Sequence, residues 1–129
     1  MIVVIDTNIL VSALWSKDGN PWAILDLLLN GKIIPCYDSR IIIEYEVVLS
    51  RSRFKFLKAE ISSLINIIEA MGLSVVPVPL DVPFTDKEDK KFYEVAKYCG
   101  AKLITGNKKH FPDDPDIITA AKFLQDFYK

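Results

Sequence analysis

The sequence predicts an α/β protein in which a mainly parallel sheet is covered by helices on both faces. Five short runs rich in β-branched residues alternate along the chain with segments whose apolar residues recur at helical spacing. This alternation implies right-handed crossovers between parallel strands. The chain has 129 residues, half of them apolar, and no segment resembles a linker. We therefore expect a single domain over residues 1–129.

The first strand is predicted at residues 2–5, where a buried β-branched run stops at Asp6. Residues 9–14 then follow a helical pattern that the sequence SKDGN interrupts. A second helix is expected from Asn20 to Leu29, with the asparagine as N-cap and Pro21 in the first turn.

The second strand is predicted at residues 33–37, although Pro35 cannot donate to a ladder and favours an irregular or edge position. Ser39 is the expected N-cap of a helix that carries Glu44 and extends to Leu49. Residues 59–71 follow with one apolar face.

The second half of the chain predicts three more strands and two more helices. A third strand is expected at residues 73–78, followed by a rigid connection with prolines at 77, 79 and 83. Asp86 can cap the next helix, which ends at Gly100. The remaining elements are strands at residues 102–105 and 117–118 and a last helix from about Thr119.

Overall charge and the cysteines restrict the setting of the protein. The net charge of −1 gives no general attraction to nucleic acid, so a polyanion would need a local basic patch. No apolar run is long enough to span a membrane and the start MIVVIDTN lacks a basic region, so we expect a cytoplasmic protein. Cys36 and Cys99 lack metal-site spacing and are expected as buried free thiols rather than a disulfide.

Acidic residues in distant segments are the candidate functional residues. Asp6 follows a buried strand, although a lone Asp there is more often a helix cap. Glu44 is flanked by apolar residues, and the alternative to a functional role is a place on the solvated face of its helix. Asp86 and Asp89 could merely complement a helix dipole. At the carboxyl edge of a parallel sheet, where ligands bind, these carboxylates would repel one another unless a cation neutralised them.

Three segments together resemble the PIN-domain family over nearly the whole chain. They are VVIDTNILVSAL, SRIIIEYEVVLSRSRF and TDKEDKKFYEVAKYCGAKLITGNKKHFP. The resemblance is strongest to the VapC-like branch, which holds toxin components of type II toxin–antitoxin systems. It implies a three-layer α/β/α sandwich with a central, mainly parallel five-stranded sheet. It also implies a ribonuclease that cleaves RNA with Mg²⁺ or Mn²⁺ and leaves a 5′-phosphate and a 3′-hydroxyl.

The resemblance also assigns roles to individual residues. It makes Asp6, Glu44 and Asp89 the catalytic and metal-binding acids, with Asp6 and Asp89 as direct ligands and Glu44 acting through water or as an orienting base. The supporting positions that it implies are Thr7, Asn8, Asp86, Thr105 and Asn107. Many family members have an acid where this chain has Asn107, which predicts weaker metal binding and puts a two-metal site in doubt.

Basic and apolar residues predict the partners. Lys87, Lys90, Lys108 and Lys109 are expected to contact RNA phosphates beside the site, as is Lys91, whereas the basic stretch 51–58 is as well explained by a solvated helix face. His110 could shuttle protons, although metal-hydroxide chemistry does not require it. Apolar surface around Trp22 and residues 27–29 predicts a homodimer or a groove for an antitoxin protein.

Two other functions fit part of the pattern. A receiver-type phosphotransfer domain would explain Asp6 and Lys108, but it leaves Glu44 and Asp89 without a role. A PIN-like module that has lost catalysis, and binds RNA or protein, would explain Asn107.

Overall fold

The computed structural model describes residues 1–129 and shows a sheet of five parallel strands in the order β3-β2-β1-β4-β5. The strands are β1 (Ile2–Ile5), β2 (Ile34–Tyr37), β3 (Leu73–Ser74), β4 (Lys102–Ile104) and β5 (Ile117–Ile118). The helices are α1 (Thr7–Trp15), α2 (Asn20–Leu29), α3 (Ser39–Leu49), α4 (Lys58–Met71), α5 (Lys90–Cys99) and α6 (Ala120–Phe127). Three short 3₁₀ turns are η1 (Ser52–Phe54), η2 (Lys87–Asp89) and η3 (Lys108–His110). The predicted α/β class is confirmed.

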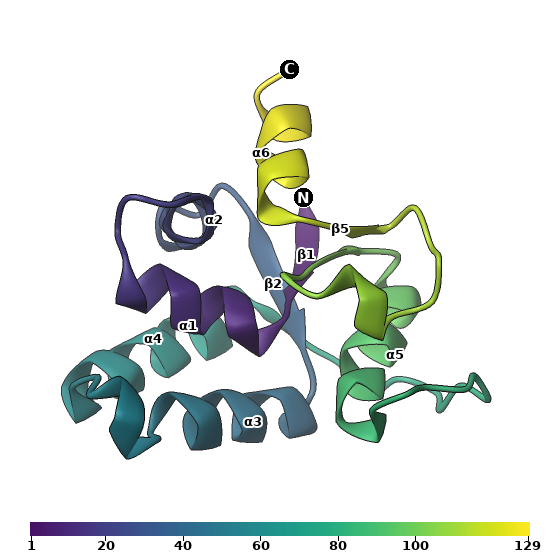
Figure 1. Cartoon of the computed structure of the whole chain (residues 1–129), viewed down its shortest axis with the longest axis horizontal. Coiled ribbons are helices and arrows are strands. Elements are labelled where there is room, and N and C mark those ends of the chain that lie inside the picture. The colour runs from purple at the N-terminus through teal and green to yellow at the C-terminus, as the bar shows by residue number, and fades with distance from the viewer.

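The helices lie on both sides of the sheet, so the fold has three layers. Helices α1 to α4 occupy one side of the strands and α5 the other (Figure 1). This division follows from right-handed crossovers, because the chain moves outward from β1 to β2 to β3 and then returns across the sheet to β4. Helix α6 packs against α2. β1 is thereby covered on both faces, and Val3, Val4 and Ile5 are fully buried.

Pro35 lies inside a regular strand, so the expectation of an irregular or edge position is wrong. β2 pairs with β1 on one side and β3 on the other. The Ile34 amide donates to the Met1 carbonyl at 2.9 Å, and alternation along the strand therefore turns the nitrogen of Pro35 away from β1. β3 pairs only with Cys36 and Tyr37, so no ladder hydrogen bond is lost at the proline.

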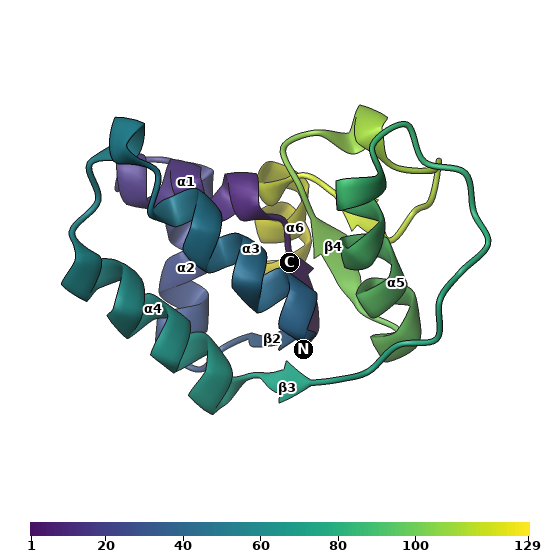
Figure 2. The same cartoon turned by 90° about the horizontal axis from the view of Figure 1, so that it is seen from below.

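The third strand is shorter than predicted. It ends at Ser74 instead of continuing to residue 78, and residues 75–86 run as an extended connection along the outside of the molecule to α5 (Figure 2). The prolines at 77, 79 and 83 remove backbone donors there. The buried Glu94 of α5 holds this connection in place by accepting from the Leu80 amide at 2.7 Å.

Helix caps agree with the sequence in part. The Asp38 side chain, and not Ser39, caps α3 by accepting from the Ile41 amide at 3.0 Å. The last helix begins where it was expected, and Thr119 caps it with its side chain, which accepts from the Lys122 amide. Asp38 caps α3 because it stands one position before Ser39, at the start of the helix, and its carboxylate is a stronger acceptor than a serine hydroxyl.

The apolar residues of α2 do not form the exposed surface that was expected. Leu27 and Leu28 are buried in the core, and Trp22 packs against it. Of the residues expected at a dimer interface or antitoxin groove on this helix only Leu29 is exposed, because α1 and α6 pack against the rest of it. Other exposed apolar side chains lie elsewhere, among them Trp15 and Leu57. No helix has the length and apolar character needed to cross a membrane.

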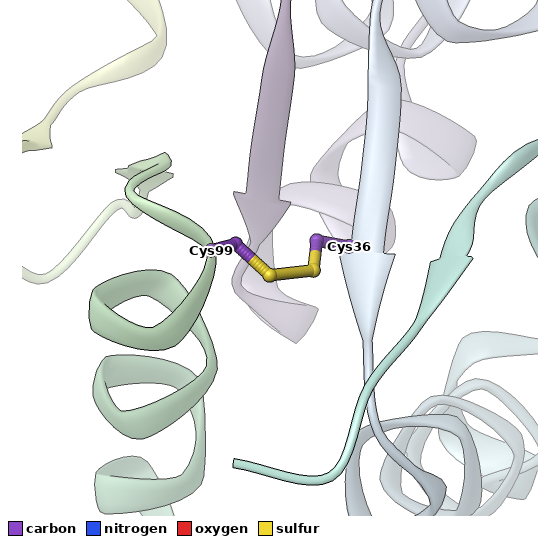
Figure 3. The surroundings of a disulfide bond; sticks show 2 residues. All are labelled: Cys36 and Cys99. Carbon is purple, nitrogen blue, oxygen red and sulfur yellow. A yellow bond between two sulfur atoms is a disulfide. The ribbon is translucent and has the colours of Figure 1, made fainter.

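The two cysteines form a disulfide, which corrects the expectation of separate thiols. Cys36 lies in β2 and Cys99 at the end of α5, 63 positions apart in sequence (Figure 3). Because α5 packs directly across β1 and β2, the fold brings the two side chains together, which spacing along the chain could not reveal. The bond ties the helix layer on this side to the sheet.

Candidate active site at the carboxyl edge of the sheet

Asp6 lies where β1 ends, beside the end of β4. These neighbouring strands mark the point at which the chain reverses its direction across the sheet, which is the usual ligand site of such folds. Asp6 precedes α1, yet its side chain makes no cap hydrogen bond to that helix. The hydroxyl of the fully buried Thr105 instead donates to Asp6 Oδ2 at 2.7 Å, and the Asn107 amide donates to the same hydroxyl at 3.0 Å. The strand end therefore orients the Asp6 carboxylate.

The ionised Asp6 carboxylate is destabilised by its surroundings. It is 6% exposed and forms no ion pair. Burial, together with the negative charges of Asp89 and Glu44, raises its pKa from 3.8 to about 6 against the lowering effect of the Thr105 hydrogen bond. The three acids that the sequence singled out are therefore close enough to act on one another.

Glu44 lies on α3 and faces the same region. The Thr7 hydroxyl donates to Glu44 Oε2, and Lys91 Nζ lies 2.7 Å from Glu44 Oε1. The glutamate side chain is 22% exposed, so it is neither a solvated residue nor an unpaired buried charge. Thr7, from the opening motif, thus orients the helix glutamate.

Asp89 ends η2 and stands directly before α5. Its Oδ2 lies 3.2 Å from His110 Nδ1 of η3. Burial and the charge of Asp86 raise the pKa of Asp89, while His110 opposes the rise. Asp86 itself accepts from the Glu88 amide at 2.9 Å, so its capping role is confirmed at η2.

The other predicted residues lie around these acids with different degrees of contact. Asn8 accepts from the Gly106 amide at 3.2 Å and so joins α1 to the turn after β4. The Asn107 side chain is exposed, and its backbone amide makes the contact to Thr105. Lys87, Lys108 and Lys109 are exposed, Lys90 is half-buried, and none of these four forms an ion pair.

Lys91 is the residue whose place the sequence did not reveal. The sequence predicts that Lys91 contacts RNA phosphates with its neighbouring lysines, but the structure shows it buried and paired with Glu44. The signal was its spacing, because Lys91 stands four residues before Val95 on the buried face of α5. A lysine at an apolar position of an amphipathic helix indicates a buried ion pair.

A groove of about 760 Å³ opens between α3 and the start of α5. Glu44, Asp89 and Lys91 line it together with the exposed side chains of Ile43 and Val47. Arg51 and Lys87 line the groove without ion pairs, whereas Arg40 is paired with Asp38 and Glu94, and the acidic Asp86 and Glu88 line it too. Arg51 and Lys87 are therefore the basic groups that a polyanion could meet on this side.

The donor set fits a hard divalent cation. Asp6 is a buried carboxylate without a cationic partner, and two further carboxylates raise its pKa. Oxygen ligands of this kind suit Mg²⁺ and Mn²⁺. As the side chains stand, no three acids, histidines or cysteines converge on one point, since Glu44 is turned to Lys91 and Asp89 to His110. Side-chain rotations would have to complete a ligand set.

The chain is similar to known proteins in sequence and in fold. The family model described as PIN domain matches residues 2–109. An uncharacterized protein of Methanocaldococcus jannaschii, MJ1680, is 36% identical over 110 residues, which cover 82% of this chain and 70% of that protein. A chain in the crystal structure of VapBC2 from Rickettsia felis, bound to a DNA fragment from their promoter, superposes with a TM-score of 0.57 at 22% identity, covering 92% of this chain and 97% of that one. The likeness to the VapBC2 chain is one of fold alone. The family model and MJ1680 match in sequence, and on the family model's match the chain belongs to the PIN domain family.

Proposed function

We propose that the protein is a divalent-metal-dependent endoribonuclease that hydrolyses phosphodiester bonds of RNA. The observation that carries this proposal is the Asp6 carboxylate, which is buried, lacks a cationic partner and lies within the electrostatic reach of Glu44 and Asp89. A buried carboxylate in this state costs stability without a bound cation, which a purely structural role does not explain. Membership of the PIN domain family supports nuclease chemistry.

The residues divide into three roles. Asp6 and Asp89 would hold Mg²⁺ or Mn²⁺, which supplies a water of lowered pKa and stabilises charge on the phosphate under attack. Thr105 orients Asp6 and Thr7 orients Glu44 through their hydroxyls. Four lysines of η2, η3 and the start of α5 that form no ion pair would bind the phosphates that flank the cleaved bond: the exposed Lys87, Lys108 and Lys109 and the half-buried Lys90.

The biological role that we propose is the toxin of a toxin–antitoxin pair, acting in the cytoplasm with an antitoxin protein as partner and as a homodimer. The fold likeness to a chain of VapBC2 supports this role. Expression of the chain alone should slow the growth of a host cell, and expression of Asp6→Asn should not. Unimpaired growth at equal protein level would contradict the toxin role without touching the nuclease proposal.

The nuclease proposal is tested by incubating the purified chain with mixed single-stranded RNA and Mg²⁺ or Mn²⁺. We expect cleavage that a chelator stops and that Asp6→Asn lowers about a thousandfold, because loss of a metal ligand removes several kcal/mol of transition-state stabilisation. Asp18→Asn is the matched control, since Asp18 is exposed and contacts none of the acids. Equal cleavage by wild type and Asp6→Asn would reveal a contaminant.

The competing proposal is a PIN-like binding module without catalysis. Asn107 in place of an acid and the ion pair of Glu44 with Lys91 favour it. It predicts that wild type and Asp6→Asn bind single-stranded RNA equally and that neither cleaves it. The same incubation, read on a gel for products and by a filter assay for binding, separates the two proposals.

Thr105→Val should shift the pH dependence of cleavage upward. The Thr105 hydrogen bond lowers the pKa of Asp6, so its loss raises that pKa further above its ordinary value. Asp6 must be ionised to bind the cation, and wild-type activity should therefore fall as the pH drops through about 6. In the variant the fall begins at higher pH, and cleavage near neutral pH drops roughly 10- to 100-fold, as for other groups that orient metal ligands.

The measurement is kcat/KM against pH at subsaturating Mn²⁺, where the free site is reported. Thr105→Ser keeps a hydroxyl and should retain the wild-type profile. An unchanged acid limb in Thr105→Val would show that the hydroxyl does not control Asp6.

A further inference from the structure

Lys91 is the one basic residue buried in this protein. Its side chain is 8% exposed and projects from the first turn of α5 toward α3. A buried ammonium group is costly unless oxygens surround it, so its position requires fixed partners.

The partners of Lys91 occupy its ammonium group completely. Nζ lies 2.7 Å from Glu44 Oε1, donates to the backbone carbonyl of Glu88 and lies 3.4 Å from Glu88 Oε2. An ammonium group has three donors, and each has an oxygen within reach. Lys91 is therefore held differently from the exposed lysines and is not free to follow RNA phosphates.

The Glu44 carboxylate is occupied in the same way. The Thr7 hydroxyl donates to Oε2, while Lys91 takes Oε1. A cation that used Glu44 as a direct ligand would have to displace one of these donors. Asp6 has no cationic partner, and Asp89 has only the exposed His110.

Charge gives the same result as geometry. Asp6, Glu44 and Asp89 carry three negative charges, and Lys91 neutralises one of them, which leaves the charge that one divalent ion balances. Asp86 and Glu88 are exposed, so solvent screens their charges and they are not counted. A second ion bound through Glu44 would share this carboxylate with the Lys91 ammonium group. Two positive charges on one partly buried carboxylate repel each other, so the second ion is disfavoured.

From these contacts we infer that Lys91 is a positioning residue whose fixed ammonium group neutralises Glu44 and limits the site to a single divalent cation held by Asp6 and Asp89. The inference rests on the proposed metal-dependent function. It assigns Glu44 an indirect role, in which it keeps Lys91 and Thr7 in place. Asn107, which stands where many family members have an acid, acts in the same direction, because it also lowers the negative charge of the site.

The test counts Mn²⁺ ions bound to the full chain, by calorimetry and by the electron paramagnetic resonance signal of free Mn²⁺. We expect one ion per chain for wild type and for Lys91→Arg, which keeps the charge. Lys91→Met removes the charge at similar length and should bind two ions. Lys32→Met is the matched control, because Lys32 is exposed at the amino end of β2, away from the acids, and it should bind one.

The outcomes separate this inference from the proposed function. Two ions on the wild-type chain, or one ion bound with unchanged affinity by Lys91→Met, would overturn the inference while leaving a chelator-sensitive nuclease intact. No Mn²⁺ on a wild-type chain that also fails to cleave RNA would overturn the proposed function first. If Lys91→Met does not fold, the counts for wild type and Lys91→Arg still decide, since two ions on either contradict the inference.

Discussion

Asp6→Asn should raise the free energy of unfolding of the cation-free protein above that of wild type, and this gain should be about 3 kcal/mol larger at pH 8 than at pH 4. The pKa of Asp6 lies at about 6 in the folded protein, against an ordinary value of 3.8. Each unit of pKa difference corresponds to about 1.4 kcal/mol between the two protonation states. Asparagine keeps a carbonyl oxygen that can accept from Thr105, but it never carries the buried charge.

The sign follows from proton binding. Between pH 3.8 and about 6 the folded protein binds the Asp6 proton and the unfolded chain does not, so wild-type stability falls as the pH rises through this window and is level above it. Asp6→Asn has no carboxyl group at this position and therefore does not lose stability over this pH range. Urea unfolding at pH 4 and pH 8 with a chelator present measures the difference, and Asp18→Asn controls for net charge.

Saturating Mn²⁺ should reverse the order of stability at pH 8, because the ion binds the folded wild type and not the variant. A pH-independent difference between Asp6→Asn and wild type would show that Asp6 is not held as a costly charge. In that case the strongest support for a metal site would be lost. The same side chain would then be an ordinary residue at a strand end.

The acids could be chosen from the sequence because the sheet edge gathers strand ends. A buried run that stops at an aspartate places that aspartate at the edge, whichever strands are neighbours. The family resemblance then selected Glu44 and Asp89 from among other acids. What the sequence could not give were the partners of each acid, because Thr105, Lys91 and His110 reach them across 99, 47 and 21 positions of chain respectively.

The local errors have a common cause. Ser39 as a cap, a third strand that extends to residue 78 and two separate thiols are expectations that rest on neighbouring residues alone. Tertiary packing decided each case. The contact of α5 with β2 pairs the cysteines, and the prolines of the connection to α5 end the strand where sheet pairing stops.

Gly72→Ala should be the most destabilising small substitution in the helix layer, lowering the free energy of unfolding by about 3 kcal/mol. Gly72 ends α4 with an extended backbone that any residue can adopt, so its need for glycine is steric. A Cβ atom there would lie 2.5 Å from the Pro35 carbonyl oxygen, 2.6 Å from that of Ile68 and 2.9 Å from Tyr37 Cε1. Two of these atoms belong to the backbone of β2 and α4 and cannot rotate away.

The substitution therefore forces α4 and β3 away from β2, whereas the entropy gained by replacing a glycine is below about 1 kcal/mol. Urea unfolding with unchanged slope should report the loss. Gly19→Ala is the matched control, because its nearest new neighbour would be Pro21 Cδ at 3.4 Å, and it should change stability by less than about 1 kcal/mol. Equal midpoints for the two variants would mean that β2 and α4 separate at little cost. Because β3 leads into the connection that carries Asp86 and Asp89, that result would also remove the rigid support on which the position of the third acid depends.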